Sequence, residues 1–105
     1  NNFSRDIVAF SRSTTIGTWA GLGFVGAKGS WLNGYIDFRV TSHELGHNWG
    51  LLHANLHRST TANPIGPGSH VEYGDCYDSM GNSLGCLEYQ NPRMHFNARY
   101  KRIFD

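Results

Sequence analysis

Residues 43–53 read HELGHNWGLLH, and this stretch constrains the fold and chemistry of the chain more than any other. His43 and His47 are one helical turn apart, so both imidazoles can reach one ion at the Zn–N distance of about 2.0–2.1 Å. Glu44 lies between them on the helix and can reach a water molecule on the open side of that ion. The pattern therefore predicts a zinc site with a general base beside it.

The third ligand requires a break in the helix. On a continuous helix, His53 would rise about 15 Å above His43 and could not share the ion. Gly50 sits where the chain must turn back, and glycine is the residue that adopts the positive φ that such a turn needs. We therefore expect Gly50 to return His53 to the ion.

Three other residues compete with His53 for the third position. In other HExxH zinc enzymes the third ligand is a downstream glutamate, so Glu72 and Glu88 are candidates. His57 is also a candidate, because it lies one helical turn beyond His53. Neither Glu72 nor His57 accounts for Gly50, and this favours His53.

The helix is expected to run from about Asp37, a suitable N-cap, to about residue 49. At 100° per residue, His43 and His47 share one side of it, and three apolar residues form a narrow stripe on the other. The stripe consists of Phe38, Leu45 and Trp49. We expect the stripe to face a core and the histidines to line a cleft.

Elsewhere the sequence predicts short elements. Apolar runs at Ile7–Phe10 and residues 19–25 predict strands, and residues 97–104 are expected to begin a last helix. Loops are expected at residues 26–34, a glycine-rich turn region, and over most of residues 54–73.

The sequence GLGFVG at residues 21–26 matches GxGxxG. It opens no helix, and the first acid that follows, Asp37, is too close for the dinucleotide fingerprint. Its glycines indicate strand irregularity or close backbone approach instead.

Composition narrows the class of protein. Hydrophobic residues make up 39% of the 105 residues and charged residues 16%, which is typical of an ordered chain. The formal net charge of +1 argues against a nucleic-acid partner. No apolar run approaches the roughly 20 residues that span a bilayer.

The two cysteines, Cys76 and Cys86, could close a small loop as a disulfide, and two unpaired thiols are the alternative. A disulfide would imply an oxidising compartment. The glycosylation sequon at Asn2 is compatible with secretion.

A second motif, DCYDSMGN at residues 75–82, has the composition of a tight turn and contains Met80. Together with HELGHNWGLLH it resembles the metzincin metalloproteases, whose Met-turn passes beneath three zinc-bound histidines. Ala54, directly after the third histidine, and the turn sequence EYGDCYDSMGN are most similar to the gametolysin family. These are secreted proteases that digest algal cell-wall and matrix glycoproteins. The resemblance covers most of the chain from Trp19 onward.

The resemblance implies an α+β fold, a zincin-like catalytic domain over residues 1–105. Residues 1–53 would hold a small sheet and the active-site helix, and residues 54–105 a loop-rich part with the Met-turn. The chain is short for a complete metzincin domain, and the family's propeptide and first helix have no counterpart here, so we expect an incomplete domain.

The resemblance also assigns the site. His43, His47 and His53 match the ligands of one zinc ion, Glu44 matches the general base, and Met80 matches a structural support that is not a ligand. The implied activity is secreted zinc-dependent endopeptidase activity on extracellular or cell-wall matrix proteins and glycoproteins. An extended substrate is expected to pair with the strand at residues 19–25 as an edge strand.

The chain departs from the pattern of other metzincins at one position. Those proteins place a tyrosine two residues after the methionine, where this chain has Asn82, so a tyrosine ligand is not carried over. Tyr73 and Tyr77 are expected to pack or hydrogen-bond in the turn. Asp75 and Asp78 could offer oxygens to Ca²⁺, but we expect them to serve as turn residues.

A second hypothesis comes from a different class of function. The short chain could be a metzincin-like domain with a structural or binding role in an extracellular assembly. The ligands and the base are all present, and this favours the endopeptidase.

Overall fold

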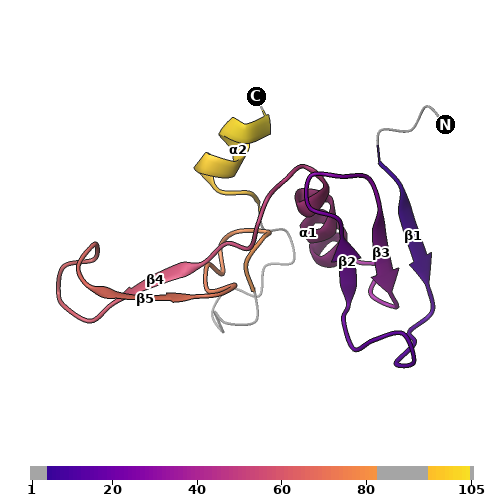
Figure 1. Ribbon diagram of the computed structural model, residues 1–105, viewed down its shortest axis with the longest axis horizontal. Helices are drawn as coiled ribbons and strands as arrows, with labels where there is room; N and C mark the ends of the chain where they lie inside the picture. The colour runs from indigo at the N-terminus through magenta and orange to yellow at the C-terminus, as the bar shows by residue number, and fades with distance from the viewer. Residues whose placement is uncertain (1–4, 83–94, 105) are drawn as a thin grey trace. The chain divides into compact units, whose positions relative to one another are not determined.

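The computed structural model describes residues 5–82 and 95–104 (Figure 1). Its elements, in chain order, are β1 (Ile7–Phe10), β2 (Gly21–Gly23), β3 (Ser30–Asn33), α1 (Phe38–Asn48), β4 (Leu56–Ser59), β5 (Gly68–Val71) and α2 (Ala98–Phe104). The described part is therefore a small mixed α/β arrangement with two sheets and two helices. The chain divides into two compact units, residues 1–52 and residues 53–105.

The first unit contains a three-stranded sheet in the order β1-β3-β2 (Figure 1). β3 runs parallel to β1, with Ile7 opposite Ser30, and antiparallel to β2, with Gly21 opposite Leu32. The prediction of β1 is confirmed. The prediction of a turn over residues 26–34 is wrong for residues 30–33, because β3 is stabilised by neighbours on both sides rather than by an apolar run of its own. The strand predicted at residues 19–25 is only three residues long.

Helix α1 contacts β2 and β3. Its predicted N-cap is confirmed, because Asp37 Oδ1 accepts the Val40 N–H at 2.8 Å. The predicted apolar core stripe is wrong: Phe38 is 59% exposed and Trp49 is 44% exposed. The buried positions of the helix are Val40, Glu44, Gly46, His47 and Asn48.

Polar contacts explain why this face is buried. Ser30 Oγ lies 3.0 Å from Asn48 Oδ1, and both residues are buried. Asn48 Nδ2 donates to the carbonyls of Phe24 and Gly29, at 3.1 and 2.9 Å. A helical wheel that counts apolar residues cannot find a face that packs through hydrogen bonds of this kind.

The second unit contains the antiparallel hairpin β4–β5, in which Leu56 lies opposite Val71 and His57 opposite His70. The prediction of loop over residues 54–73 is wrong for both strands. Their sequences, LHRS and GSHV, lack the alternation of apolar and polar residues that identifies a strand. The predicted last helix is confirmed as α2, and Asn97 Oδ1 accepts the Tyr100 N–H at 3.0 Å in its first turn.

Among the described residues, neither α1 nor α2 has the length and apolar character needed to cross a membrane.

Candidate metal centre

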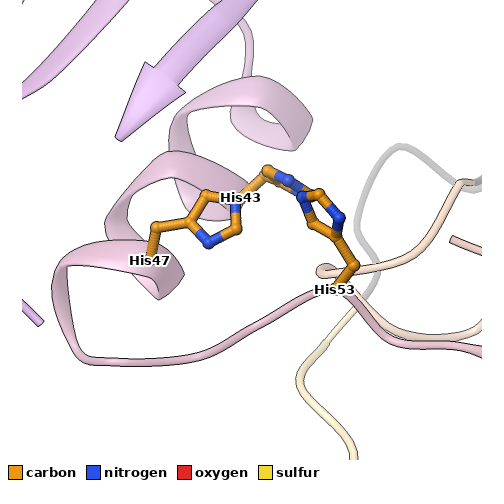
Figure 2. Close-up of side chains that lie close together, drawn as sticks. All are labelled: His43, His47 and His53. Atoms are coloured by element: carbon orange, nitrogen blue, oxygen red, sulfur yellow. The ribbon is translucent and has the colours of Figure 1, made fainter. Parts of the chain in front are cut away.

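The three histidines of the opening motif come together (Figure 2). One ligand nitrogen each from His43, His47 and His53 lies within 4.8 Å of the others. Nitrogens that share one ion at 2.0–2.1 Å lie at most about 4.2 Å apart, so this spacing is close to what a shared ion requires. The rings of His43 and His47 meet nearly at right angles, with centroids 4.8 Å apart.

The end of α1 brings the chain from the second histidine to the third. Gly50 has φ of +90°, its N–H donates to the His47 carbonyl at 2.8 Å, and the Leu51 N–H donates to the Gly46 carbonyl at 3.0 Å. These are the two hydrogen bonds of a Schellman motif. No atom lies within 4 Å of the position that a Cβ on Gly50 would take, so the backbone conformation, and not lack of space, requires glycine here. The expected turn at Gly50 is present.

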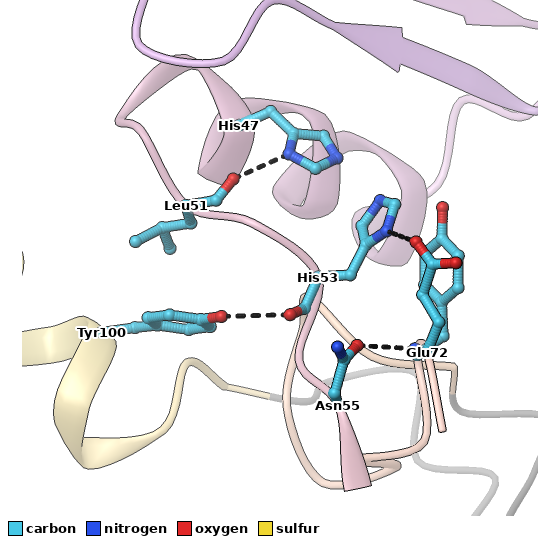
Figure 3. A network of polar contacts seen from close by, with 7 residues as sticks. His47, Leu51, His53, Asn55, Glu72 and Tyr100 are labelled. Carbon is cyan, nitrogen blue, oxygen red and sulfur yellow. Dashed lines mark hydrogen bonds and ion pairs between the residues drawn. The ribbon is translucent and has the colours of Figure 1, made fainter. Parts of the chain in front are cut away.

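The same turn also orients His47. The Nδ1 of His47 lies 2.8 Å from the carbonyl oxygen of Leu51 (Figure 3). Because a carbonyl can only accept, Nδ1 carries the proton and Nε2 keeps the lone pair that a metal needs. Both residues are buried, so this contact lies in a protected environment. No sequence signal predicts this contact, since the partner is a backbone carbonyl.

His53 is oriented by a carboxylate. Its Nδ1 lies 2.7 Å from Glu72 Oε1 (Figure 3). The carboxylate accepts the Nδ1–H, which again leaves Nε2 for a metal. The backbone carbonyl of His53 accepts the Tyr100 hydroxyl of α2 at 3.3 Å. Glu72, considered above as a competing ligand, therefore lies behind His53 and acts as its hydrogen-bond acceptor.

The other competing ligands do not belong to this group. His57 lies on β4, where its Nε2 donates to the Gly66 carbonyl at 2.9 Å and its ring lies beside that of His70. It is not part of the metal-ligating group found among the described residues. Glu88 lies outside the described residues.

Glu44, expected to reach water on the open side of the ion, is instead buried against Gly21 and Gly23 of β2 and is 6% exposed. The Gly23 N–H donates to its carboxylate, and burial raises its pKa from 4.5 to about 7 against the opposing effect of that hydrogen bond. A Cβ on Gly23 would lie 2.6 Å from the Glu44 carbonyl oxygen, and one on Gly21 would overlap the Glu44 carboxylate. The close backbone approach predicted for these glycines is confirmed.

Met80 is fully buried in the turn at residues 75–82. Its carbonyl accepts the Ala54 N–H at 2.9 Å, and the Ala54 carbonyl accepts the Asp75 N–H at 3.1 Å. The turn therefore holds the residue directly after His53 by two backbone hydrogen bonds. This arrangement agrees with a supporting rather than a ligating position for Met80.

The acids of this turn bind backbone groups. Asp75 Oδ1 accepts the Tyr77 N–H at 3.0 Å, and Asp78 Oδ1 accepts the Met80 N–H at 2.6 Å. The other oxygen of Asp78 accepts the Asn97 N–H, which joins the turn to the start of α2. Burial is the main cause that raises the pKa of Asp78.

Cys76 is buried and disulfide-bonded. Its expected partner, Cys86, lies outside the described residues.

Comparison of the chain with protein-family models, with curated proteins and with solved structures finds no match in any of the three. The functional assignment therefore depends on the motifs and on the geometry of the three histidines.

Proposed function

We propose that this chain is a secreted, zinc-dependent endopeptidase of the metzincin type, most similar to the gametolysin family. Its substrates would be extracellular or cell-wall matrix proteins and glycoproteins. The observation that carries the proposal is the group of three histidines, whose ligand nitrogens lie within 4.8 Å of one another. Two of them, His47 and His53, also have their Nδ1 atoms bound to oxygen acceptors.

Zinc fits this set of donors because imidazole nitrogen is among its preferred ligands, and three protein ligands leave a fourth position open. When bound there, zinc supplies Lewis acidity, which polarises a peptide carbonyl and makes water a better nucleophile near neutral pH. The hydrogen bonds from Nδ1 of His47 and His53 fix the tautomer that can bind a metal.

Glu44 is the candidate general base. It neighbours His43 on α1 and is not part of the metal-ligating group, and in the proposed mechanism its carboxylate takes a proton from the attacking water. It would then pass that proton to the leaving amine. A pKa of about 7 suits both steps, because the carboxyl group can gain and lose a proton near neutral pH.

The edge strand β2 is the candidate binding site for an extended substrate. Ala20 and Phe24, on either side of β2, bond through their backbone groups to the β3 side. Alternation along the strand then directs the backbone groups of Gly21 and Gly23 away from β3, and of these the Gly23 N–H donates to Glu44. A substrate that pairs with this edge would lie beside the strand that packs on Glu44.

The test combines metal content with proteolysis. We expect one zinc per chain, and cleavage of a denatured matrix glycoprotein that a chelator abolishes. Glu44→Ala should keep zinc and lose about 10²- to 10⁴-fold in cleavage rate, whereas Asp6→Ala, which removes an exposed carboxylate from the same unit, should change neither.

Undiminished cleavage by Glu44→Ala would refute the general-base assignment. Zinc binding without cleavage, together with stoichiometric binding to matrix proteins, would favour the structural or binding alternative over the endopeptidase.

A further inference from the structure

The third histidine differs from the other two in how its side chain is held. His43 and His47 lie on α1, so the helix fixes where both side chains leave the backbone, and the Leu51 carbonyl orients the ring of His47. His53 follows the end of the helix and precedes β4, in a stretch without regular structure. Its imidazole must therefore be oriented by contacts from elsewhere in the chain.

Two consecutive residues contact this imidazole. Glu72 Oε1 lies 2.7 Å from Nδ1 (Figure 3), and the ring of Tyr73 stacks on the His53 ring, with centroids 3.7 Å apart and planes at 30°. The hydrogen bond to Glu72 fixes the rotation of the ring about its Cβ–Cγ bond, and the stacking of Tyr73 restricts the tilt of the ring plane. Together they leave Nε2 pointing in one direction.

The backbone at Tyr73 is what allows both contacts. Consecutive side chains of an extended strand point to opposite faces, so two neighbours cannot normally contact the same ring. Glu72 and Tyr73 instead form a turn after the last residue of β5, where Tyr73 has φ of +59° and is the one residue other than glycine with positive φ among the described residues. This conformation is rare for a side chain of this size.

Two side contacts hold Tyr73 in that conformation. Its N–H donates to Asn55 Oδ1 at 3.2 Å, and its carbonyl accepts the Asn82 N–H at 2.7 Å. Asn82 ends the turn that contains Met80, and Asn55 lies two residues after His53. The rare backbone conformation is therefore supported from both sides, as expected for a strained residue retained at a functional site.

We propose that Glu72 and Tyr73 form a clamp that positions His53 as the third metal ligand. Glu72 accepts the Nδ1–H, Tyr73 covers one face of the ring, and the pair holds Nε2 in its ligating direction before the ion binds. The inference rests on the proposed function for the identity of the ion and for His53 as its third ligand. Both are positioning residues, since they act through His53.

The test measures zinc affinity by competition with a chromophoric chelator. Glu72→Ala should weaken zinc binding by about 10- to 100-fold, the usual effect of removing a partner behind a metal-bound histidine. Glu72→Gln keeps an acceptor oxygen and should lose less. Tyr73→Gly should weaken binding in the same direction, whereas Tyr73→Phe, which keeps the ring, should stay within about twofold of the native protein. Tyr77→Ala is the control, because it removes an exposed tyrosine from the neighbouring turn.

Two further readouts separate positioning from general stability. Glycine adopts positive φ without strain, so the metal-free Tyr73→Gly protein should unfold at the same or a higher urea concentration than metal-free Tyr73→Ala. The Co²⁺-substituted Glu72→Ala protein should show an altered visible absorption spectrum, which reports on the geometry around the ion. If zinc affinity is lost only in variants whose metal-free form is unfolded, the loss reflects general stability and the clamp is overturned.

His53→Ala distinguishes failure of the clamp from failure of the proposed function. If His53→Ala weakens zinc binding but Glu72→Ala and Tyr73→Gly bind zinc as tightly as the native protein, the clamp is overturned and the ligand assignment stands. If His53→Ala itself binds zinc with native affinity, the third ligand of the proposed function is overturned.

Discussion

The contact between β2 and α1 determines whether the substitution Gly23→Ala raises or lowers the stability of the protein. In Gly23→Ala, the new Cβ would lie 2.6 Å from the Glu44 carbonyl oxygen, 3.1 Å from its Oε2 and 3.2 Å from its carbonyl carbon. The closest atom belongs to the helix backbone and cannot rotate away. To reach an ordinary contact distance of 3.4 Å, the strand must move about 0.8 Å away from the helix.

Overpacking of this kind typically costs about 1–3 kcal/mol. For a chain of this length, about 4 °C in melting temperature corresponds to 1 kcal/mol, so we expect a decrease of about 4–12 °C. The displacement also weakens the hydrogen bond from the Gly23 N–H to the Glu44 carboxylate. The added methyl group would therefore destabilise the protein and also weaken the hydrogen bond that holds the candidate base.

The assay is urea unfolding of the metal-free protein, with Leu22→Ala as the matched control. Leu22 lies on the same strand, its side chain is 49% exposed, and its loss should change the free energy of unfolding by about 0.5 kcal/mol or less. Where alanine fits, replacing glycine stabilises a protein by about 0.4–1 kcal/mol, because the unfolded chain loses entropy. A Gly23→Ala protein that is more stable than the native one would refute the packing argument.

Four further outcomes follow from the same contacts. In the metal-free protein, the raised pKa of Glu44 means that the folded state binds more protons than the unfolded state between pH 4.5 and about pH 7. The free energy of unfolding should therefore fall by up to about 3 kcal/mol as the pH rises through this window. In urea titrations of Glu44→Gln, this dependence of stability on pH should be lost. Gly50→Ala should cost about 1–2 kcal/mol and weaken zinc binding, and Gly50→Asn should lose less in both assays. Asp78→Ala leaves the N–H groups of Met80 and Asn97 without their acceptor and should cost about 1–3 kcal/mol in thermal unfolding. Zinc at 100 times its Kd should stabilise the protein by about 2.7 kcal/mol, or roughly 10 °C, and a chelator should remove this gain.

The elements that could be predicted from the sequence carry their own local signals. α1 has a capping aspartate at one end and a glycine with positive φ at the other, so both of its ends follow from neighbouring residues. β1 is an apolar run bounded by polar residues. In each case the determinant lies within a few residues of the element, and a reading of the sequence alone can find it.

The elements that could not be predicted depend on distant partners. β3 contains a serine and an asparagine, and its strand conformation comes from pairing with β1 and β2. The β4–β5 hairpin pairs His57 with His70 and has little apolar character, so no periodicity identifies it. The buried face of α1 was missed for a related reason, because Asn48 packs through hydrogen bonds to loop carbonyls.

The same distinction applies within the site. The candidate ligands and base are side chains whose chemistry and spacing can be read from the sequence. The contacts that orient these side chains cannot be read from the sequence. The acceptor behind His47 is the backbone carbonyl of Leu51. The contacts of Glu72 and Tyr73 with His53 depend on a backbone conformation that tyrosine rarely adopts. Gly50 affects both the ligands and the contacts that orient them. Its positive φ turns the chain toward His53 and also places the Leu51 carbonyl against His47. A substitution at Gly50 should therefore affect two ligands at once, whereas substitutions at Glu72 or Tyr73 should affect the third ligand alone.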